Sequence, residues 1–112
     1  MRSRLFRVLV SGPSMVPTLR DGDHVVVWRT GAARPGAVVV VALPDRPLAV
    51  KRLVRVEPDG RWWVEGDNPH GSTDSRTLGP LPVDAVLGVA LGRLWPRPGR
   101  LRRGSGYADY AD

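Results

Sequence analysis

Hydrophobic residues in this chain gather in short, valine-rich runs that are separated by polar turns. Runs of this length that contain β-branched residues are typical of strands rather than helices. The chain also holds 13 Gly and 11 Pro, which favour frequent turns and disfavour long helices. The pattern predicts strands at residues 5–10, 24–29, 37–43, 48–57 and 61–65.

Two of these runs make a more specific prediction about burial. Residues 37–43 are apolar throughout, so we expect this strand to be buried on both faces. Residues 48–57 alternate instead, which puts Lys51 and Leu53 on one face of the strand and Arg52 on the other. The Pro-Asp-Gly turn that follows predicts a β-hairpin with the next strand.

The rest of the chain is less regular. We expect residues 66–82 to form a long polar loop with little helix or strand propensity. For residues 83–95 we favour a strand with a bulge, and the alternative is a short helix followed by a strand. Residues 96–112 are basic and then acidic, and we expect a flexible tail. The fold is thus predicted to be all-β, with one compact domain of residues 1–95 whose mostly antiparallel strands form a rolled or barrel-like sheet.

Composition limits the classes of function that the chain could have. Its 112 residues fit one domain, and the lack of cysteine excludes disulfides, thiolate chemistry and cysteine-bound zinc. The net charge is +6, but no recognition motif accompanies the scattered basic residues, which argues against nucleic acid as a partner. No apolar run approaches the roughly 20 residues that a transmembrane helix needs. We therefore expect a cytoplasmic protein, with membrane association if the full-length protein carries an anchor outside this sequence.

Lys51 stands out in the composition. The chain has 17 Lys and Arg residues, of which 16 are Arg and only Lys51 is Lys. Arginine stays protonated in proteins, whereas a buried lysine can lose its proton. If its face of the strand is buried, desolvation lowers the pKa of Lys51 and allows its amine to act as a general base. The alternative is a lysine whose stem lies along a strand edge and whose amine reaches water.

Ser14 is the candidate nucleophile. It lies in the run GPSMVPTL, residues 12–19, where two prolines fix the backbone around it. Serine is a weak nucleophile without a base, so the alternative is an ordinary serine in a proline-rich turn. A third polar segment, residues 66–76, is dense in hydroxyl and carboxylate groups, and its alternative is a solvated loop. Within it, His70 and Asp74 could also complete a Ser-His-Asp triad with the serine.

The three segments resemble, in order, the sequence boxes around the active site of type I signal peptidases. GPSMVPTL resembles the nucleophile box, VKRL at residues 50–53 the general-base box, and GDNPHGSTDSR at residues 66–76 the third box. The resemblance spans residues 12–76, over half of the chain. It implies a serine endopeptidase with a Ser-Lys dyad on a signal-peptidase-like core, and it implies no metal or organic cofactor.

The resemblance also implies a role for each matching residue. Ser14 is the nucleophile, Lys51 the general base, and Ser72 the hydroxyl that orients the lysine amine. The Ser14 backbone N–H belongs to the oxyanion hole. Gly12 stands where some members have a second donor hydroxyl, which makes Ser11 a candidate to replace it. Ion pairs that support the site are implied for four further residues, Arg52, Asp67, Asp74 and Arg76.

Within this family the chain is most similar to the soluble nickel-type superoxide dismutase maturation proteases. The similarity lies in its small size, and in the lack of an N-terminal membrane helix and of a second β domain. The implied substrate is a precursor with a short N-terminal propeptide, such as that of nickel superoxide dismutase. Three alternatives remain: a signal peptidase core that cleaves exported preproteins, a self-cleaving repressor-type protease, and a non-catalytic basic β-module that binds nucleic acid or protein.

Overall fold

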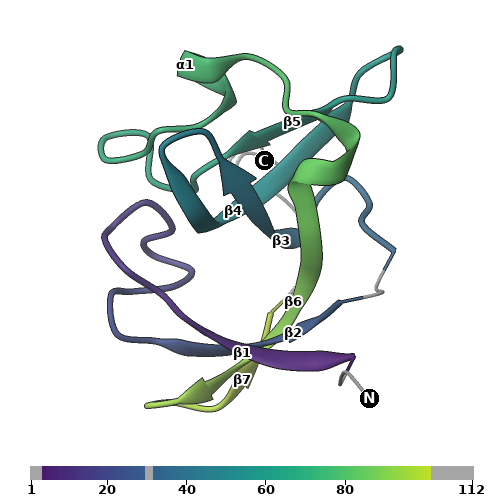
Figure 1. Ribbon diagram of the computed structural model, residues 1–112. Coiled ribbons are helices and arrows are strands. Elements are labelled where there is room, and N and C mark those ends of the chain that lie inside the picture. The colour runs from purple at the N-terminus through teal and green to yellow at the C-terminus, as the bar shows by residue number, and fades with distance from the viewer. Residues whose placement is uncertain (1–3, 30–31, 102–112) are drawn as a thin grey trace, which may run out of the picture.

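The computed structural model describes residues 4–29 and 32–101, and strands dominate it (Figure 1). Two short helical segments are present, the helix α1 (Ser75–Leu78) and the 3-10 turn η1 (Val83–Ala85). In the described part of the chain, no helix is both long enough and apolar enough to cross a membrane. The strands are β1 (Leu5–Leu9), β2 (His24–Trp28), β3 (Val38–Leu43), β4 (Arg46–Val56), β5 (Trp62–Glu65), β6 (Val86–Trp95) and β7 (Gly99–Arg100).

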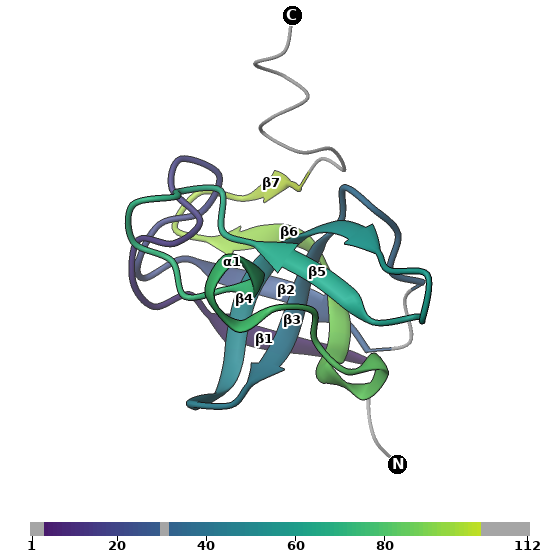
Figure 2. The ribbon, with the colours of Figure 1, turned by 90° about the horizontal axis from the view of Figure 1, so that it is seen from above.

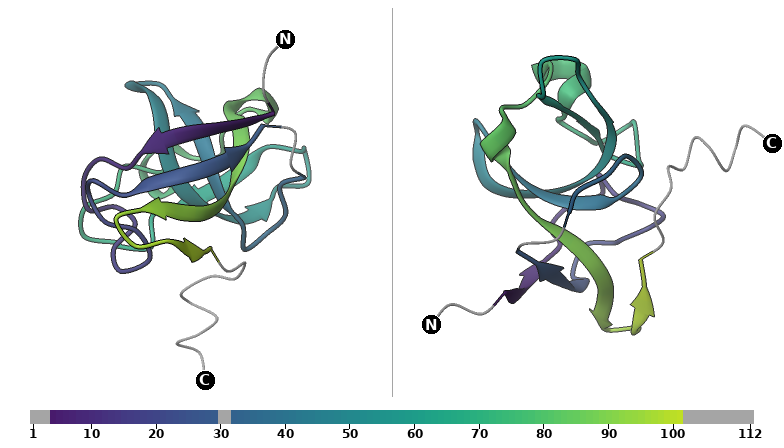
Figure 3. Two further views of the ribbon diagram at one scale, coloured as in Figure 1. Left: turned by 90° about the horizontal axis from the view of Figure 1, so that it is seen from below. Right: turned by 90° about the vertical axis from the view of Figure 1, so that its right-hand side faces the viewer.

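All these strands belong to one sheet with antiparallel pairing throughout. The order is β1-β2-β6-β3-β4-β5, and β7 also pairs with β6. Strand β6 joins the two halves of the molecule, because residues 89–95 pair with β2 and residues 86–89 pair with β3. Figure 1 shows β6 passing from the half with β3, β4 and β5 to the half with β1, β2 and β7. The sheet rolls up around this strand (Figures 2 and 3), and the predicted all-β fold is confirmed.

Strand β3 separates two hydrophobic cores. Its residues Val38 and Val40 belong to one core, together with side chains of β1, β2 and the loop between them. Its residues Val39 and Val41 belong to the other, together with side chains of β4, β5 and η1. The expected burial of this strand on both faces is confirmed. Burying a valine fully stabilises a fold by roughly 1.5–3 kcal/mol, so β3 holds both halves of the molecule together.

The prediction of a plain loop over residues 66–82 is wrong at α1. The side chain of Asp74 caps this helix by accepting a hydrogen bond from the Arg76 N–H. Ser75 ties the helix to β5, because its Oγ accepts a hydrogen bond from the Val64 N–H at 2.9 Å. The helix depends on these contacts, and its four residues show no apolar periodicity from which it could have been predicted.

Strand β6 begins at Val86, so the prediction of a strand over residues 83–95 is wrong for its first three residues. They form η1, which a hydrogen bond from the Ala85 N–H to the Pro82 carbonyl closes at 3.0 Å. The alternative of a helical turn followed by a strand describes this segment better. The strand starts at Val86, directly after this turn, and Val86 pairs with Val41 of β3.

The ends of two other elements also differ from expectation. Strand β4 begins at Arg46 rather than residue 48, because Arg46 pairs with Leu43 across a very short turn. In the expected tail, Gly99 and Arg100 form β7 and pair with β6. Residues 102–112 lie outside the described residues, and the division into a domain and a tail at residue 95 stays a prediction.

Gly88 provides a test of the junction between β6 and β2. A Cβ atom there would lie 2.6 Å from Cγ1 of Val27 and 3.0 Å from the Trp28 carbonyl oxygen. We expect Gly88→Ala to lower the free energy of unfolding by about 1–3 kcal/mol, since an overpacked core must shift. Urea denaturation measures this. Gly99→Ala is the matched control, because its Cβ would approach nothing closer than 3.4 Å; equal stability of both variants would contradict the packing argument.

Candidate active site

Lys51 lies in the middle of β4 and is only 2% exposed. It pairs with Val39 of β3, and it shares its face of β4 with Leu53, which packs in the second core. The condition on which a lowered pKa depends, burial of this face of the strand, is therefore met, and the alternative of a lysine whose amine reaches water at a strand edge does not hold. The apolar stem of a lysine suits these surroundings, but its charged amine loses the water that would stabilise it.

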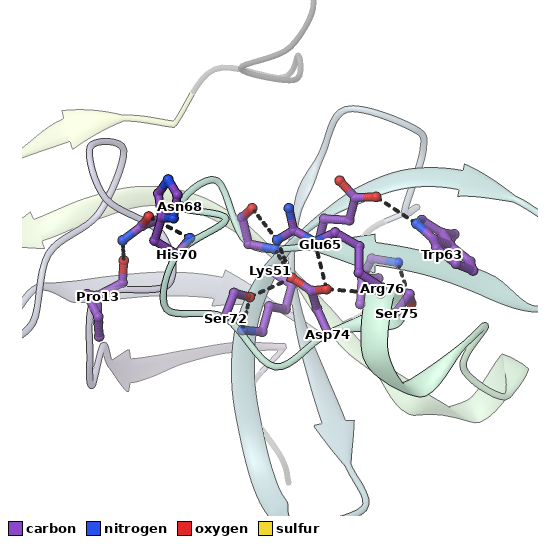
Figure 4. A network of polar contacts seen from close by, with 12 residues as sticks. Pro13, Lys51, Trp63, Glu65, Asn68, His70, Ser72, Asp74, Ser75 and Arg76 are labelled. Carbon is purple, nitrogen blue, oxygen red and sulfur yellow. Dashed lines mark hydrogen bonds and ion pairs between the residues drawn. The ribbon is translucent and has the colours of Figure 1, made fainter.

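One hydrogen bond joins the amine of Lys51 to Ser72, and a second joins Ser72 to Asp74 (Figure 4). Its Nζ donates to Ser72 Oγ at 3.0 Å, and Ser72 Oγ donates in turn to Oδ2 of Asp74 at 2.5 Å. Because the hydroxyl proton of Ser72 points at Asp74, its oxygen lone pairs face the amine. Ser72 thus fixes the direction of the amine, and a neutral amine keeps its own lone pair for another direction.

Asp74 is fully buried at 0% exposure, and N–H groups surround its carboxylate. Arg76 binds both oxygens, with Nε at 3.1 Å from Oδ1 and Nη2 at 2.7 Å from Oδ2, and the Gly66 N–H donates at 2.8 Å. Burial alone would raise the pKa of Asp74. Hydrogen bonds from Arg76, Ser72 and Gly66 outweigh burial and lower the pKa to about 2, so the group remains a carboxylate at neutral pH.

Burial lowers the pKa of Lys51 below its ordinary value, because desolvation disfavours the ammonium form. The negative charge of Asp74 opposes this change, while the positive charges of Arg46 and Arg76 lower the pKa further. The lowering of the pKa matters for a role as general base, since an ordinary lysine is almost wholly protonated at neutral pH. A lowered pKa increases the fraction of neutral amine that could accept a proton.

Ser14 lies in the loop between β1 and β2, and the segment after β5 holds this loop in place. The Asn68 N–H donates to the Ser14 carbonyl at 2.9 Å, and Nδ2 of Asn68 donates to the Pro13 carbonyl at 3.1 Å. Gly66 allows the close approach, because a Cβ atom there would clash with both the Ser14 carbonyl oxygen and Ser72 Oγ. The main chain around Ser14 is therefore fixed against the segment that carries Ser72.

A second buried ion pair lies on the opposite face of β4. Nη2 of Arg52 is 2.7 Å from Oδ2 of Asp67, and Nε is 3.2 Å from Oδ1. The hydroxyl of Thr18 also donates to Asp67, and Nη1 of Arg52 donates to the Gly36 carbonyl at 3.0 Å. This cluster joins the loop of Ser14, β4 and the segment after β5.

Ser14 and Lys51 line the same cleft, which has a volume of about 300 Å³. Ser11, the candidate second oxyanion donor, lines it as well. Ser72 accepts a hydrogen bond from the amine of Lys51. The other four predicted residues form two ion pairs near the lysine, Arg52 with Asp67 and Arg76 with Asp74. The structure thus brings all the predicted site residues to one region.

The Ser-His-Asp alternative gains no support from the structure. His70 is exposed, and its backbone N–H donates to Oδ1 of Asn68 at 3.1 Å. In the described part of the chain, the carboxylate of Asp74 receives its hydrogen bonds from Arg76, Ser72 and Gly66.

Asn68 and Thr18 form hydrogen bonds in the site that were not predicted from the sequence. Both lie inside the segments that resemble peptidase boxes, and this is the one signal that could have pointed to them. Their hydrogen-bond partners, Pro13 and Asp67, lie 55 and 49 residues away along the chain. A contact at such a distance depends on the folded topology, which the local sequence does not contain.

Similarity to known proteins covers the same part of the chain. The Peptidase S24-like family model matches residues 1–80. Mitochondrial ATP-independent inner membrane protease subunit 1a of Arabidopsis thaliana is 36% identical in an alignment 115 positions long, which covers 78% of this chain and 68% of that protein. Mitochondrial inner membrane protease subunit 1 of Homo sapiens is 31% identical over 114 residues, 80% of this chain and 69% of that protein. Subunit 2 of Saccharomyces cerevisiae is 31% identical over 117 residues, with shares of 78% and 66%.

The carboxylate of Asp74 makes the stability of the fold depend on pH. Its folded pKa of about 2 lies below the ordinary 3.8, so the stabilisation is complete above about pH 4 and is lost as the pH falls toward 2. We expect Asp74→Asn to lower the free energy of unfolding by about 2 kcal/mol at pH 7, and by less at pH 3. Denaturant titrations at both pH values measure the difference. The control is Asp84→Asn, which changes an exposed carboxylate; a loss of the same size at both pH values would contradict the assignment.

Proposed function

We propose that this chain, which belongs to the Peptidase S24-like family, is a serine endopeptidase with Ser14 as nucleophile and Lys51 as general base. The protease class follows from the family and from relatives that are named as proteases. One observation carries the choice of residues: a buried lysine, held by Ser72 at 3.0 Å, lines the same cleft as Ser14. A buried lysine amine in the same cleft as a serine is an arrangement that can activate the hydroxyl.

The proposed reaction is acyl transfer. The neutral amine of Lys51 takes the proton of Ser14 Oγ, and Oγ attacks the carbonyl carbon of the scissile peptide bond. The backbone N–H of Ser14, with the Ser11 hydroxyl as a second donor, stabilises the oxyanion. The protonated amine then gives its proton to the leaving nitrogen, and the peptide bond breaks. Lys51 next takes a proton from water, whose oxygen attacks the ester carbon. The bond between this carbon and Ser14 Oγ then breaks, Lys51 returns its proton to Oγ, and the second product leaves with a new carboxyl group.

The remaining polar residues position this pair. Ser72 orients the amine of Lys51. Asp74 accepts the hydroxyl proton of Ser72, so that the lone pairs of the Ser72 oxygen face Lys51. Arg76 neutralises much of the charge of Asp74, which weakens the pull of that carboxylate on the lysine proton. Asn68 fixes the carbonyl of Ser14.

The walls of the cleft suit an extended peptide. The Val10 N–H donates to Asp23, and the Arg29 N–H donates to Arg4, so the even-numbered residues of β1 direct their peptide groups toward β2. Because peptide groups alternate along a strand, those of Arg7 and Leu9 point away from β2 and toward the cleft. Strand β5 pairs only with residues 52–56 of β4, which leaves the first half of β4 as the other wall. A substrate segment can add to such edges as a further strand.

We favour preproteins as substrates, as in the signal-peptidase alternative. The expected nickel superoxide dismutase precursor has no support from the relatives, which are named mitochondrial inner membrane proteases. The expected cytoplasmic location lacks support for the same reason, and we propose that the enzyme acts at a membrane surface. Leu9 and Leu48, which line the cleft and are 60% and 46% exposed, offer apolar surface near its opening.

Cleavage by dyad variants tests the function. The purified chain is incubated in detergent with a preprotein that has an Ala-x-Ala cleavage site and, separately, with the nickel superoxide dismutase precursor, and new N-termini are mapped by mass spectrometry. We expect cleavage of the preprotein, and a loss of about 10⁴-fold or more in kcat/KM for Ser14→Ala and Lys51→Arg. Arginine keeps the charge of Lys51 but cannot act as a base.

The matched control for the lysine variant is Arg61→Lys, a change between the same residue types at an exposed ion pair outside the cleft. Retained activity in Lys51→Arg would rule out the dyad. Cleavage of the superoxide dismutase precursor alone would keep the dyad and overturn the preference for preproteins.

The lowered pKa of Lys51 predicts the pH dependence of the activity. We expect kcat/KM to rise with pH as the lysine loses its proton, with a midpoint below the ordinary value of 10.5. Because the charge of Arg46 lowers the pKa of Lys51, Arg46→Gln should move the midpoint to higher pH. Arg34→Gln is the control, since Arg34 does not line the cleft. A midpoint that stays unchanged in Arg46→Gln would argue against Lys51 as the titrating base.

A further inference from the structure

We propose that the cleft selects substrate segments with an acidic side chain about five residues from the scissile bond, and that Arg7 and Arg46 bind this side chain. The proposal rests on the proposed function, because it takes Ser14 and Lys51 as the reacting end of the cleft. It adds a chemical class of substrate, an extended acidic segment, to that function.

The charges that line the cleft all have one sign. Arg7 comes from the β1 wall and Arg46 from the β4 wall, and Lys51 lies at the reacting end. None of the described residues that line the cleft is an aspartate or a glutamate. Since charges of one sign in a cleft attract ligands of the other sign, the cleft favours a segment with negative charge.

Several arginines elsewhere in the fold have carboxylate partners. Arg61 lies 2.8 Å from Asp59, and Arg55 lies 3.3 Å from Glu57. In the part of the chain that the structure describes, Arg7 forms no ion pair with a carboxylate. Arg46 has only Asp45 at 3.9 Å, and both of these side chains are at least half exposed, so this pair is weak. The two cleft arginines therefore keep most of their capacity to bind a carboxylate from a ligand.

The spacing along β4 sets the position of the acidic residue. Arg46 precedes Lys51 by five positions, which corresponds to at most roughly 16 Å at the rise of a strand, because the pairing of β4 with β3 is irregular between residues 46 and 49. A substrate that lies extended along the same strand covers this length in about five residues. Leu48 lies between the two positions and lines the cleft together with Leu9 of the opposite wall. The segment between the acidic residue and the scissile bond should thus carry apolar side chains.

Binding of synthetic peptides tests the proposal without cleavage. The probes are fluorescein-labelled ten-residue peptides of alternating leucine and alanine, with a pair of glutamates at the N-terminal or the C-terminal end. Matched peptides carry glutamines at the same places. We expect the Ser14→Ala chain to bind one glutamate peptide about fivefold more tightly than its glutamine match at low ionic strength. This ratio should fall toward one at about 0.5 M salt, because salt screens exposed charges.

Two double variants separate the cleft from the general basic charge of the chain. In Arg7→Gln/Arg46→Gln on the Ser14→Ala background, the ratio of affinities should fall to about one. Arg34→Gln/Arg61→Gln removes the same two charges outside the cleft, and it should keep the ratio. Equal binding of all peptides to the Ser14→Ala chain would overturn the proposal, as would a ratio that survives in the cleft variant or disappears in the control.

A cleavage experiment with a peptide library derived from a proteome distinguishes this proposal from the proposed function. Wild-type cleavage sites, mapped by mass spectrometry, should be enriched in aspartate or glutamate about five residues from the cut, and the cleft variant should lose the enrichment. Cleavage that requires Ser14 but shows no such enrichment would overturn the acidic preference and leave the dyad standing. Cleavage that persists in Ser14→Ala would overturn the proposed function, and the binding ratio then decides on the acidic preference by itself.

Discussion

The removal of the Lys51 amine from water is the constraint on which the rest of the site depends. The amine of a lysine that is only 2% exposed needs a hydrogen-bond acceptor, and Ser72 supplies it. A carboxylate in direct contact would also satisfy the amine, but it would hold the proton on the lysine. The chain places Asp74 one hydroxyl group away and binds it through both oxygens to Arg76. The amine is thus satisfied while its pKa stays lowered.

The fold meets this constraint with two neighbouring residues of one strand. Because alternate side chains of β4 point to opposite faces, Lys51 faces Ser72 and Arg52 faces Asp67. The segment after β5 therefore crosses both sides of the same strand with residues 67–74. A shift of β4 by one position would exchange the two faces and leave buried charges without partners. The two ion pairs consequently fix the register of the strand as well as the position of the lysine.

The strands and the placement of Lys51 and Arg52 on one of them could be predicted from the sequence, because they depend on local patterns of apolar and polar residues. The apolar run of β3 and the alternation of β4 correctly predicted the fold class and the separation of Lys51 and Arg52 on opposite faces of one strand. The helix α1 and the roles of Asn68 and Thr18 were not predicted, because Ser75, Asn68 and Thr18 form hydrogen bonds to residues 11, 55 and 49 positions away along the chain. The turn η1 was predicted only as the alternative of a short helix before the strand. Asp74 accepts hydrogen bonds from both the helix and Ser72. Such hydrogen bonds of a single aspartate produce no periodic pattern of apolar residues, so the sequence does not reveal them.

Arg46 has two proposed roles, to lower the pKa of Lys51 and to bind a substrate carboxylate, and the second affects the first. Its positive charge lowers the pKa of Lys51, and a substrate carboxylate bound to it would reduce this contribution. Burial, the largest cause of the lowered pKa, is already present in the chain without substrate. When substrate weakens the contribution of Arg46, the stronger effect of burial would therefore remain. The lysine would remain able to act as a base while the substrate occupies the cleft.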